Sequence, residues 1–353
     1  MKRIYSLDVL RVVATICIVF HHYQQITGAF FEGGLNFFGG RFEFGMVVEF
    51  FFVLSGFLAY RYVENLEKLG DFKTFIRHKI IRLLPLMAIS GVIYEVFLLL
   101  YNHICKTPWM LGNNLTVWGT IINALGIQSG WAFQNGLVNN PTWYVSDLLL
   151  CYIVFYFLLY LSRKKDIPVM YLFTGMVFLG AGIVTYGIEL PFMNIYTSKG
   201  YYAFFFGLIL GRFLYNREIT AKMAVVSLLI AVLVPYGLVN HFYYFEQGLI
   251  YLMAFVYYPA LIILFLSKPV KRIFDYRLFG ALGEITYDVY IWHVPMMLLM
   301  YVIFELLAVN VNVQSAVVMM LFAVSMFGVG TVSHYLLDLP LRKKLDMKFE
   351  KKV

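Results

Sequence analysis

The feature that most constrains this chain is a series of apolar segments, each long enough to cross a bilayer as an α-helix. About 20 mainly apolar residues span the hydrocarbon core, and ten segments meet that length. They cover approximately residues 7–27, 44–63, 80–101, 143–161, 168–187, 200–215, 223–239, 248–267, 284–305 and 314–337. The sequence therefore predicts an all-α polytopic membrane protein, a bundle of about ten transmembrane helices.

Composition agrees with this interpretation. The chain is 61% hydrophobic and 14% charged, whereas soluble domains are about half apolar and about a quarter charged. The long connection 102–142 is rich in Asn and Gly, and we expect a re-entrant or interfacial helix at 114–127. Cys17, Cys105 and Cys151 have no C-x-x-C spacing, so the sequence indicates neither a disulfide framework nor a zinc site.

The net charge of +8 could suggest a nucleic-acid partner, but the placement of the basic residues explains it otherwise. If the N-terminus is cytoplasmic, nearly all of the 28 Lys and Arg residues fall in cytoplasmic segments. Only Arg41, Lys106 and Lys199 lie outside, as the positive-inside rule expects. We therefore expect a multi-pass protein of the cytoplasmic (inner) membrane with both termini inside and no nucleic-acid partner. We also expect a single transmembrane domain over 1–353 with a short basic cytoplasmic tail at 341–353 and no fused soluble domain.

The first span contains four ionisable residues, which in a bilayer usually face protein or a wet cavity. Arg11 and His22 are eleven positions apart, so they share one helix face about 16 Å apart along the axis. Asp8 lies within about 60° of that face, while His21 points about 100° away. One interpretation is an Arg at the inner headgroups, His residues at the outer interface and Asp8 as a local partner. The other is that His22 acts as a general base for a hydroxyl nucleophile while Arg11 binds or neutralises an anion.

The basic residues Arg77, Lys79 and Arg82 lie just before and within the third span. Lys79 and Arg82 are three apart and share a face. This is ordinary juxtamembrane charge attracted to anionic lipid, or else a phosphate clamp for a cytosolic nucleotide-like cofactor. No Gly-rich phosphate loop accompanies these residues, so composition does not decide between the two.

Two further segments also allow a structural and a functional interpretation. Ser55 and Gly56 in the second span are small residues that permit close helix packing, or Gly56 opens room for a substrate and the Ser55 hydroxyl lines it. At the start of the fourth span, Trp143 is typical of a membrane interface. Asp147 is either a buried cap or a functional carboxylate.

Polar residues four positions apart mark the last two spans. They are Glu284, Asp288 and Trp292, then His334 and Asp338. The first three form a stripe that we expect to face other helices, and the last two form a helical His–carboxylate pair. None of these sets has a convincing number of ligands at metal spacing, so no metal is predicted.

Six short motifs follow one another over about residues 5–342. They are Arg11 with ten residues before His22, FFVLSGF at 51–57, Lys79-x-x-Arg82-x-x-Pro85, the aromatic entry at Trp143, Thr286-Tyr287-x-x-Tyr290-x-Trp292-His293 and Asp338-x-Pro340. Each is weak alone. Together and in this order they resemble the acyltransferase family 3 membrane proteins, integral enzymes that O-acylate surface carbohydrates in bacteria.

The resemblance implies a ten-helix enzyme that takes an acyl group, usually acetyl from acetyl-CoA, and passes it to a hydroxyl of a cell-surface carbohydrate or lipid-linked sugar. The catalytic motif maps onto Arg11 and His22, and the basic element onto Lys79 and Arg82. Many members have a Glu five residues after the position of Trp143, where this chain has Leu148 beside Asp147, so a carboxylate role there is in doubt. Some members carry a fused extracytoplasmic hydrolase-like domain. This chain ends soon after its last span, so we expect it to act alone or with a separate extracytoplasmic partner.

These expectations combine into one arrangement. The cytosolic anion acyl-CoA would bind near Arg77, Lys79 and Arg82, with Arg11 about 6 Å and His22 about 22 Å into the membrane. The pantetheine arm would reach His22 between helices while the sugar approaches from outside. The cavity would be lined by Asp8, Ser55, Trp143, Asp147, Tyr287 and His293. His22 either takes the acceptor's proton or is itself transiently acylated.

Two other classes of protein stay open. A transporter for sugars or lipid-linked glycans would use the polar stripes as a pathway, and internal repeats, which we do not find by inspection, would favour it. A catalytically silent sensor could share the acyltransferase scaffold, although the presence of both Arg11 and His22 argues against silence.

Overall fold

The structure, a computed structural model, describes residues 3–32, 34, 36–40, 43–65, 69–105, 107–131, 138–240 and 246–350. Within these residues the chain is overwhelmingly helical and contains no β-strand, which confirms the all-α prediction. Of the basic residues used above, Arg41, Lys106 and the last residues of the tail lie outside the described part.

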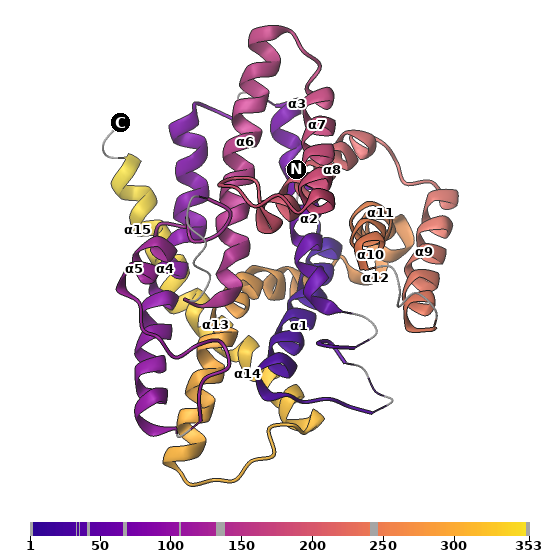
Figure 1. Ribbon diagram of the computed structural model, residues 1–353. Helices are drawn as coiled ribbons and strands as arrows, with labels where there is room; N and C mark the ends of the chain where they lie inside the picture. The colour runs from indigo at the N-terminus through magenta and orange to yellow at the C-terminus, as the bar shows by residue number, and fades with distance from the viewer. Residues whose placement is uncertain are drawn as a thin grey trace.

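The helices follow one another with short connections (Figure 1). They are α1 (Tyr5–Thr27), α2 (Val47–Ala59), α3 (Arg61–Glu64), α4 (Phe72–Ile104), α5 (Val117–Ala124), α6 (Trp143–Lys165), α7 (Val169–Tyr186), α8 (Ile195–Leu214), α9 (Ala221–Asn240), α10 (Glu246–Leu252), α11 (Tyr258–Leu266), α12 (Lys268–Phe274), α13 (Arg277–Leu306), α14 (Ala316–Ser333) and α15 (Leu339–Glu350). Short π-helices at Met253–Tyr257 and His334–Asp338 join α10 to α11 and α14 to α15. The helix expected within 114–127 is α5.

Nine stretches of the described chain are long and apolar enough to cross a membrane. They are Tyr5–Thr27, Phe44–Glu64, Phe72–Ile104, Asn140–Lys165, Val169–Tyr186, Ala221–Asn240, Gly248–Leu266, Arg277–Leu306 and Ala316–Lys348. The remaining expected span, 200–215, is helix α8, which has 20 residues but carries Thr197, Ser198 and Lys199 near its start. Most of α8 is buried within the protein. A helix surrounded by other helices needs no continuous apolar surface. This explains why α8 is less apolar than the nine stretches above.

Several helices are longer than the apolar runs that predicted them. We expected the third span to begin near residue 80, but α4 begins at Phe72, where the Asp71 side chain accepts a hydrogen bond from the backbone N–H of Thr74. An acidic N-cap of this kind satisfies an otherwise unpaired donor of the first turn. Consequently Arg77, Lys79 and Arg82 all lie on one continuous helix rather than in a flanking loop.

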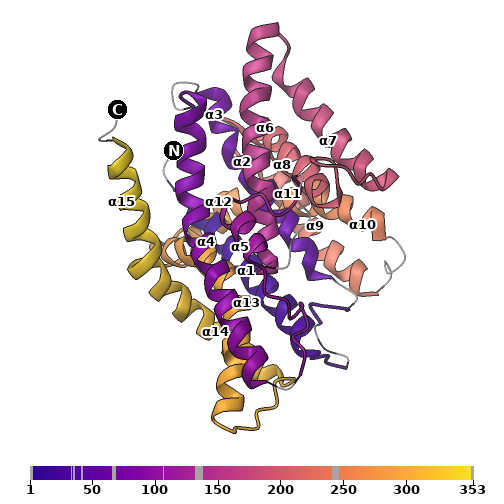
Figure 2. The same ribbon diagram turned by 60° about the vertical axis from the view of Figure 1, so that its left-hand side comes forward.

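Two helices organise the bundle. Helix α13 packs against α1, α4 and α14, and α8 packs against α2 and α7. Figures 1 and 2 show α13 beside α1 in both views, with α6 and α7 extending to one end of the molecule and the loop before α14 at the other. The first-span residues are therefore positioned by α13, from the C-terminal third of the chain.

Glycine allows the closest helix contact, between α2 and α8. A Cβ at Gly56 would overlap the backbone oxygen of Phe204, and a Cβ at Gly207 would overlap that of Val53. The two backbones touch here, so the structure supports the packing interpretation of Gly56. It leaves no room for a substrate at that position.

We predict that Gly207→Ala destabilises the protein. Overpacking costs typically about 1–3 kcal/mol, and the neighbouring backbone oxygen of Val53 has no side-chain freedom with which to move away. This exceeds the helix-propensity gain of roughly 0.5–1 kcal/mol expected when Ala replaces a helical Gly. Thermal unfolding in detergent should show a lower Tm. The control is Gly328→Ala on α14, where a Cβ would meet no heavy atom within 4 Å; equal Tm values for the two variants would contradict the packing argument.

Candidate functional site

At the start of α1, Asp8 forms the ion pair with Arg11 that their spacing predicts. Arg11 Nη1 donates to Asp8 Oδ1 at 2.7 Å, and Arg3 Nε donates to Oδ2 at 2.6 Å. Asp8 is buried, whereas the Arg11 side chain is 24% exposed. Gly283 of α13 lies directly against Asp8, because a Cβ there would be 2.5 Å from the Asp8 Cβ. Asp8 is thus a buried counter-charge held between α1 and α13.

At the other end of the same face, His22 lies beside His293 of α13, with ring centroids 5.1 Å apart. The Nδ1 of His293 is 2.7 Å from the carbonyl oxygen of Tyr290. A carbonyl only accepts hydrogen bonds, so Nδ1 carries the proton and Nε2 of the neutral ring keeps its lone pair. That Nε2 is buried and has no hydrogen-bond partner among the described residues.

His22 is held in the same way. Its Nδ1 lies 2.9 Å from Oε1 of Gln25, one turn further along α1. With the amide oxygen as acceptor, Nδ1 donates and Nε2 is the basic nitrogen. The fold therefore brings together two neutral imidazoles, each with Nδ1 tied to an acceptor and each with Nε2 able to accept a proton.

His21 does not belong to this pair. Its Nδ1 lies 2.8 Å from Oε1 of Glu43, just before α2. Burial alone would raise the pKa of Glu43, but the hydrogen bond from His21 and those from backbone N–H groups of the loop outweigh burial and hold this pKa below its usual value. His21 thus fixes the loop between α1 and α2. The rings of His21 and His22 still touch edge to face, with centroids 5.0 Å apart, but their hydrogen bonds go to different partners.

Three basic side chains, those of Arg11, Lys79 and Arg82, lie near the start of α1. Arg82 of α4 interacts electrostatically with both Arg11 and Lys79. The Lys79 ammonium lies over the faces of three aromatic rings, those of Tyr152 at 4.2 Å, Tyr62 at 5.1 Å and Phe75 at 5.3 Å. Ring faces attract a cation but supply no formal counter-charge. Arg77 is two residues before Lys79 on the same helix, and its side chain therefore leaves α4 about 200° around the axis.

Ser55 and aromatic residues lie between the cations and the histidines. The Ser55 hydroxyl is 3.5 Å from that of Tyr144. The Tyr144 ring is 5.9 Å from Tyr290, whose ring is 5.9 Å from His293. Tyr144 also interacts electrostatically with Arg11. Ser55 and Tyr144 thus connect the two ends of the site. Tyr144 was not singled out by sequence, because aromatic residues are common at span ends.

Tyr287 has a structural contact. Its hydroxyl donates to the backbone oxygen of Leu83 at 2.5 Å, which ties α13 to α4. The expected cavity-lining role of Tyr287 therefore stays a prediction, and the observed bond places its oxygen on the backbone of the neighbouring helix.

Trp143 and Asp147 lie in a separate cluster with α8. The Lys199 ammonium is 5.3 Å from the Trp143 ring and 3.7 Å from Oε1 of the buried Glu49. Asp147 is buried against Gly130, and its carboxylate oxygens have no hydrogen-bond partner in the described part of the chain. Sequence reasoning missed Glu49 and Lys199, although a carboxylate inside an apolar span is itself a signal. These contacts associate Trp143 and Asp147 with α8 rather than with the histidine pair.

The polar stripes of the last two spans meet. His334 Nδ1 lies 3.2 Å from Oδ2 of Asp288 and 3.6 Å from Oδ2 of Asp338, and Asp338 also pairs with Arg342. Potential ligand atoms of the two aspartates and the histidine lie within 4.8 Å of one another, a grouping that could hold a metal ion. Spacing along the chain did not reveal it, because Asp288 comes from a different helix. The ion pairs with Arg342 and His334 account for this cluster, and we assign it a structural role. Glu284 points elsewhere and pairs with Arg3.

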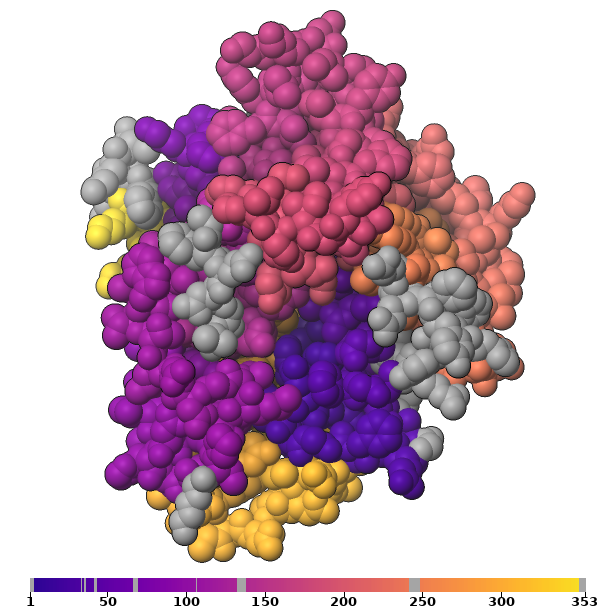
Figure 3. Space-filling model, viewed as in Figure 1, coloured from indigo at the N-terminus to yellow at the C-terminus, as the bar shows by residue number. Residues whose placement is uncertain are grey.

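One face of the molecule brings these helices to the surface. In Figure 3 a crease separates the purple surface around α4 and α5 from the indigo surface of α1, and gold atoms of the C-terminal third are visible within it. Helices α1, α4 and α13 carry the cations and the histidines described above.

The fold and its buried ionisable residues define a multi-pass helical membrane protein. A family model described as an acyltransferase domain matches residues 4–335, which is most of the chain. The protein therefore belongs to acyltransferase family 3, which supports an acyltransferase rather than a transporter. Comparisons with curated proteins and with solved structures give no match.

We predict that Asp8→Asn destabilises the protein strongly. Removing one partner of a buried ion pair costs roughly 3–5 kcal/mol, and this change leaves both Arg3 and Arg11 without their shared carboxylate. Glu284→Gln is the matched control, because Glu284 also pairs with Arg3 but its side chain is 46% exposed. Exposed pairs contribute at most about 1 kcal/mol. Thermal unfolding should rank the variants in this order, and a larger loss for Glu284→Gln would refute the assignment of Asp8.

Proposed function

We propose that the protein transfers an acyl group, as acetyl from cytosolic acetyl-CoA, to a hydroxyl of a cell-surface carbohydrate or lipid-linked sugar. The observation that carries the proposal is the arrangement along α1, with a neutral basic pair, His22 and His293, at one end and the cation Arg11 at the other. Membership of an acyltransferase family supplies the reaction class. The donor, the acceptor and the cytoplasmic membrane are parts of the proposal.

The cationic group suits the anionic donor. Arg82 interacts electrostatically with both Arg11 and Lys79. Guanidinium and ammonium groups are the usual partners of phosphate. With both termini in the cytoplasm, as the basic residues indicate, this group would lie toward the inner side, where acyl-CoA is found. Arg11 and His22 are about 16 Å apart along α1. An extended donor could therefore place its phosphates near Arg82 and its thioester near His22.

In the proposed reaction, Nε2 of His22 takes the proton of the acceptor hydroxyl as the hydroxyl oxygen attacks the thioester carbonyl. The carbon–sulfur bond then breaks, the acyl group stays on the sugar oxygen, and the CoA thiolate leaves with the proton returned by His22. General base catalysis of this kind contributes typically 10²–10⁴ in rate. Because Nδ1 of His22 is bonded to Gln25, the nitrogen that accepts the proton is defined before the substrate binds.

His293 would stabilise the protonated form of His22. When Nε2 of His22 gains a proton, it becomes a donor, and the adjacent His293 ring offers a buried Nε2 that has no hydrogen-bond partner among the described residues. The two rings would not both be protonated, since adjacent cations in a low-dielectric interior repel strongly. Polar groups next to the pair include Gln25, His21 with Glu43 bonded to it, and the Tyr290 carbonyl.

We expect purified protein in lipid to move label from acetyl-CoA to a glycan acceptor only when His22 is intact. His22→Ala should lower transfer by at least about 100-fold and leave acetyl-CoA binding in place. Arg82→Gln is the complementary variant, expected to weaken donor binding instead. Transfer at the wild-type rate by folded His22→Ala would overturn the assignment of the base. If the wild type binds the donor but transfers label to none of the acceptors, the catalytically silent sensor is favoured. If the wild type does not bind the donor, the transporter is favoured.

We predict that His293→Leu lowers transfer, because the variant has no acceptor for the proton that His22 takes up. His293→Gln keeps an acceptor oxygen and should retain more activity than His293→Leu, measured as label moved from acetyl-CoA to the acceptor. Equal losses in the two variants would mean that His293 only fills space.

A further inference from the structure

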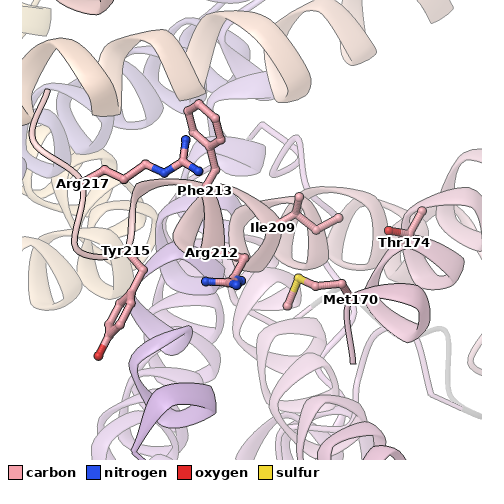
Figure 4. Close-up of a pocket in the computed structure, with 7 residues that line it drawn as sticks. All are labelled: Met170, Thr174, Ile209, Arg212, Phe213, Tyr215 and Arg217. Carbon is pink, nitrogen blue, oxygen red and sulfur yellow. The ribbon is translucent and has the colours of Figure 1, made fainter. Parts of the chain in front are cut away.

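A second cationic site lies outside the region assigned to acyl transfer. The end of α8, the loop after it and the start of α7 line an open pocket of about 350 Å³. Two arginines, Arg212 and Arg217, line it together with the apolar or aromatic side chains of Met170, Ile209, Phe213 and Tyr215. In Figure 4, Arg217 of the following loop lies beside the Phe213 ring, and Arg212 of the last turn of α8 lies on the side of Met170.

The two arginines are held in place by aromatic side chains. The Arg217 guanidinium carbon lies 4.9 Å from the centre of the Phe213 ring. Arg212 interacts with the hydroxyl of Tyr60, the residue that follows α2, and this hydroxyl also donates to the carboxylate of Glu64. No carboxylate is among the residues that line the pocket. Glu218, the acid that follows Arg217, is bonded to Lys268 at 3.0 Å. The pocket therefore holds two positive charges beside an apolar wall.

Two arginines beside an apolar wall indicate which class of ligand would bind in the pocket. Guanidinium groups bind phosphate with two parallel hydrogen bonds, so a pair of them indicates a phosphate-bearing ligand. The volume falls within the range of organic ligand sites and leaves space beyond a single phosphate. The apolar wall made by Met170, Ile209 and Phe213 would be in contact with the organic part of the ligand.

The position of the pocket favours a lipid as the source of that phosphate. On α7 the side chains of Tyr171 and Phe178 are exposed on the outside of the bundle, which is the surface that a bilayer covers. The pocket lies at the end of α7 that follows the basic residues Arg163, Lys164 and Lys165. Basic pockets between membrane helices at the cytoplasmic side bind the headgroups of anionic lipids.

We propose that Arg212 and Arg217 form a binding site for the phosphate headgroup of an anionic membrane lipid. The site is separate from His22, Arg11 and the cations of α4, and it does not depend on the proposed acyl transfer. Lipid phosphate would bridge the start of α7 and the end of α8, and would thereby fix α8 against α2 through Tyr60.

The test compares lipid retention in two double variants. Protein reconstituted in vesicles of phosphatidylglycerol and phosphatidylcholine is extracted in mild detergent, and bound lipid is measured by native mass spectrometry. Arg212→Gln with Arg217→Gln should lose the preference for phosphatidylglycerol roughly tenfold, about the effect of 1.4 kcal/mol. Lys271→Gln with Arg272→Gln on α12 removes the same charge without touching the pocket and should retain the preference.

The remaining outcomes are equally decisive. If both double variants lose the lipid to the same extent, general surface charge explains the binding and the site is wrong. Inorganic phosphate and glycerol phosphate, added to the extracted protein, identify the source. If the lipid stays bound in the presence of both compounds, the lipid assignment is supported. If either compound displaces the lipid, the pocket is assigned to a soluble phosphate compound and the lipid assignment is overturned. Because acetyl-CoA is absent from these measurements, their failure would leave the proposed transfer reaction unaffected.

Discussion

The contact between α1 and α13 is the constraint on which the rest of the site depends. Gly283 lets the two helices approach until Asp8 lies against the α13 backbone, and Asp8 in turn holds Arg3 and Arg11. The same pair of helices, further along, brings His22 beside His293. Charge at one end and neutral imidazoles at the other are therefore set by one helix–helix interface. A shift of α13 by one residue would separate both pairs at once.

Burying ionisable groups in a membrane protein is costly unless each is paired or neutral, and the structure uses both solutions. Asp8 and the cluster of Asp288, His334 and Asp338 are compensated by cations and by one another. The histidines are instead kept neutral, each with Nδ1 bonded to an acceptor. The Lys79 ammonium lies against aromatic faces, which supply no formal counter-charge. Groups that are fully compensated have structural roles, and groups with remaining capacity are those that a substrate could use.

Periodicity predicted a large part of this arrangement. Apolar length gave the helices, and a spacing of eleven placed Arg11 and His22 on one face, because both depend only on the geometry of a single helix. Spacing within one helix also paired Asp8 with Arg11. What it did not predict were contacts between helices distant in sequence, such as His22 with His293, Asp288 with His334 and Glu49 with Lys199. These depend on which helices become neighbours. Helix α8 was expected at 200–215 and is less apolar than the other spans for a related reason, since a helix buried in the bundle does not need the apolar surface that hydropathy measures.

The two cationic regions differ in what surrounds them, and that difference separates their proposed roles. Lys79 and Arg82 lie on the helix that packs against α13, and Arg82 acts on Arg11 at the base of the histidine-bearing face. An anion bound there would have its uncharged portion directed along α1 toward His22. Arg212 and Arg217 lie at the far side of α2, in a pocket bounded by apolar side chains and a lipid-facing helix. A phosphate held there has no path along α1, and its effect would be on the packing of α8 against α2. The two proposed anion sites thus differ in direction, one in line with the proposed base and the other in line with the bilayer.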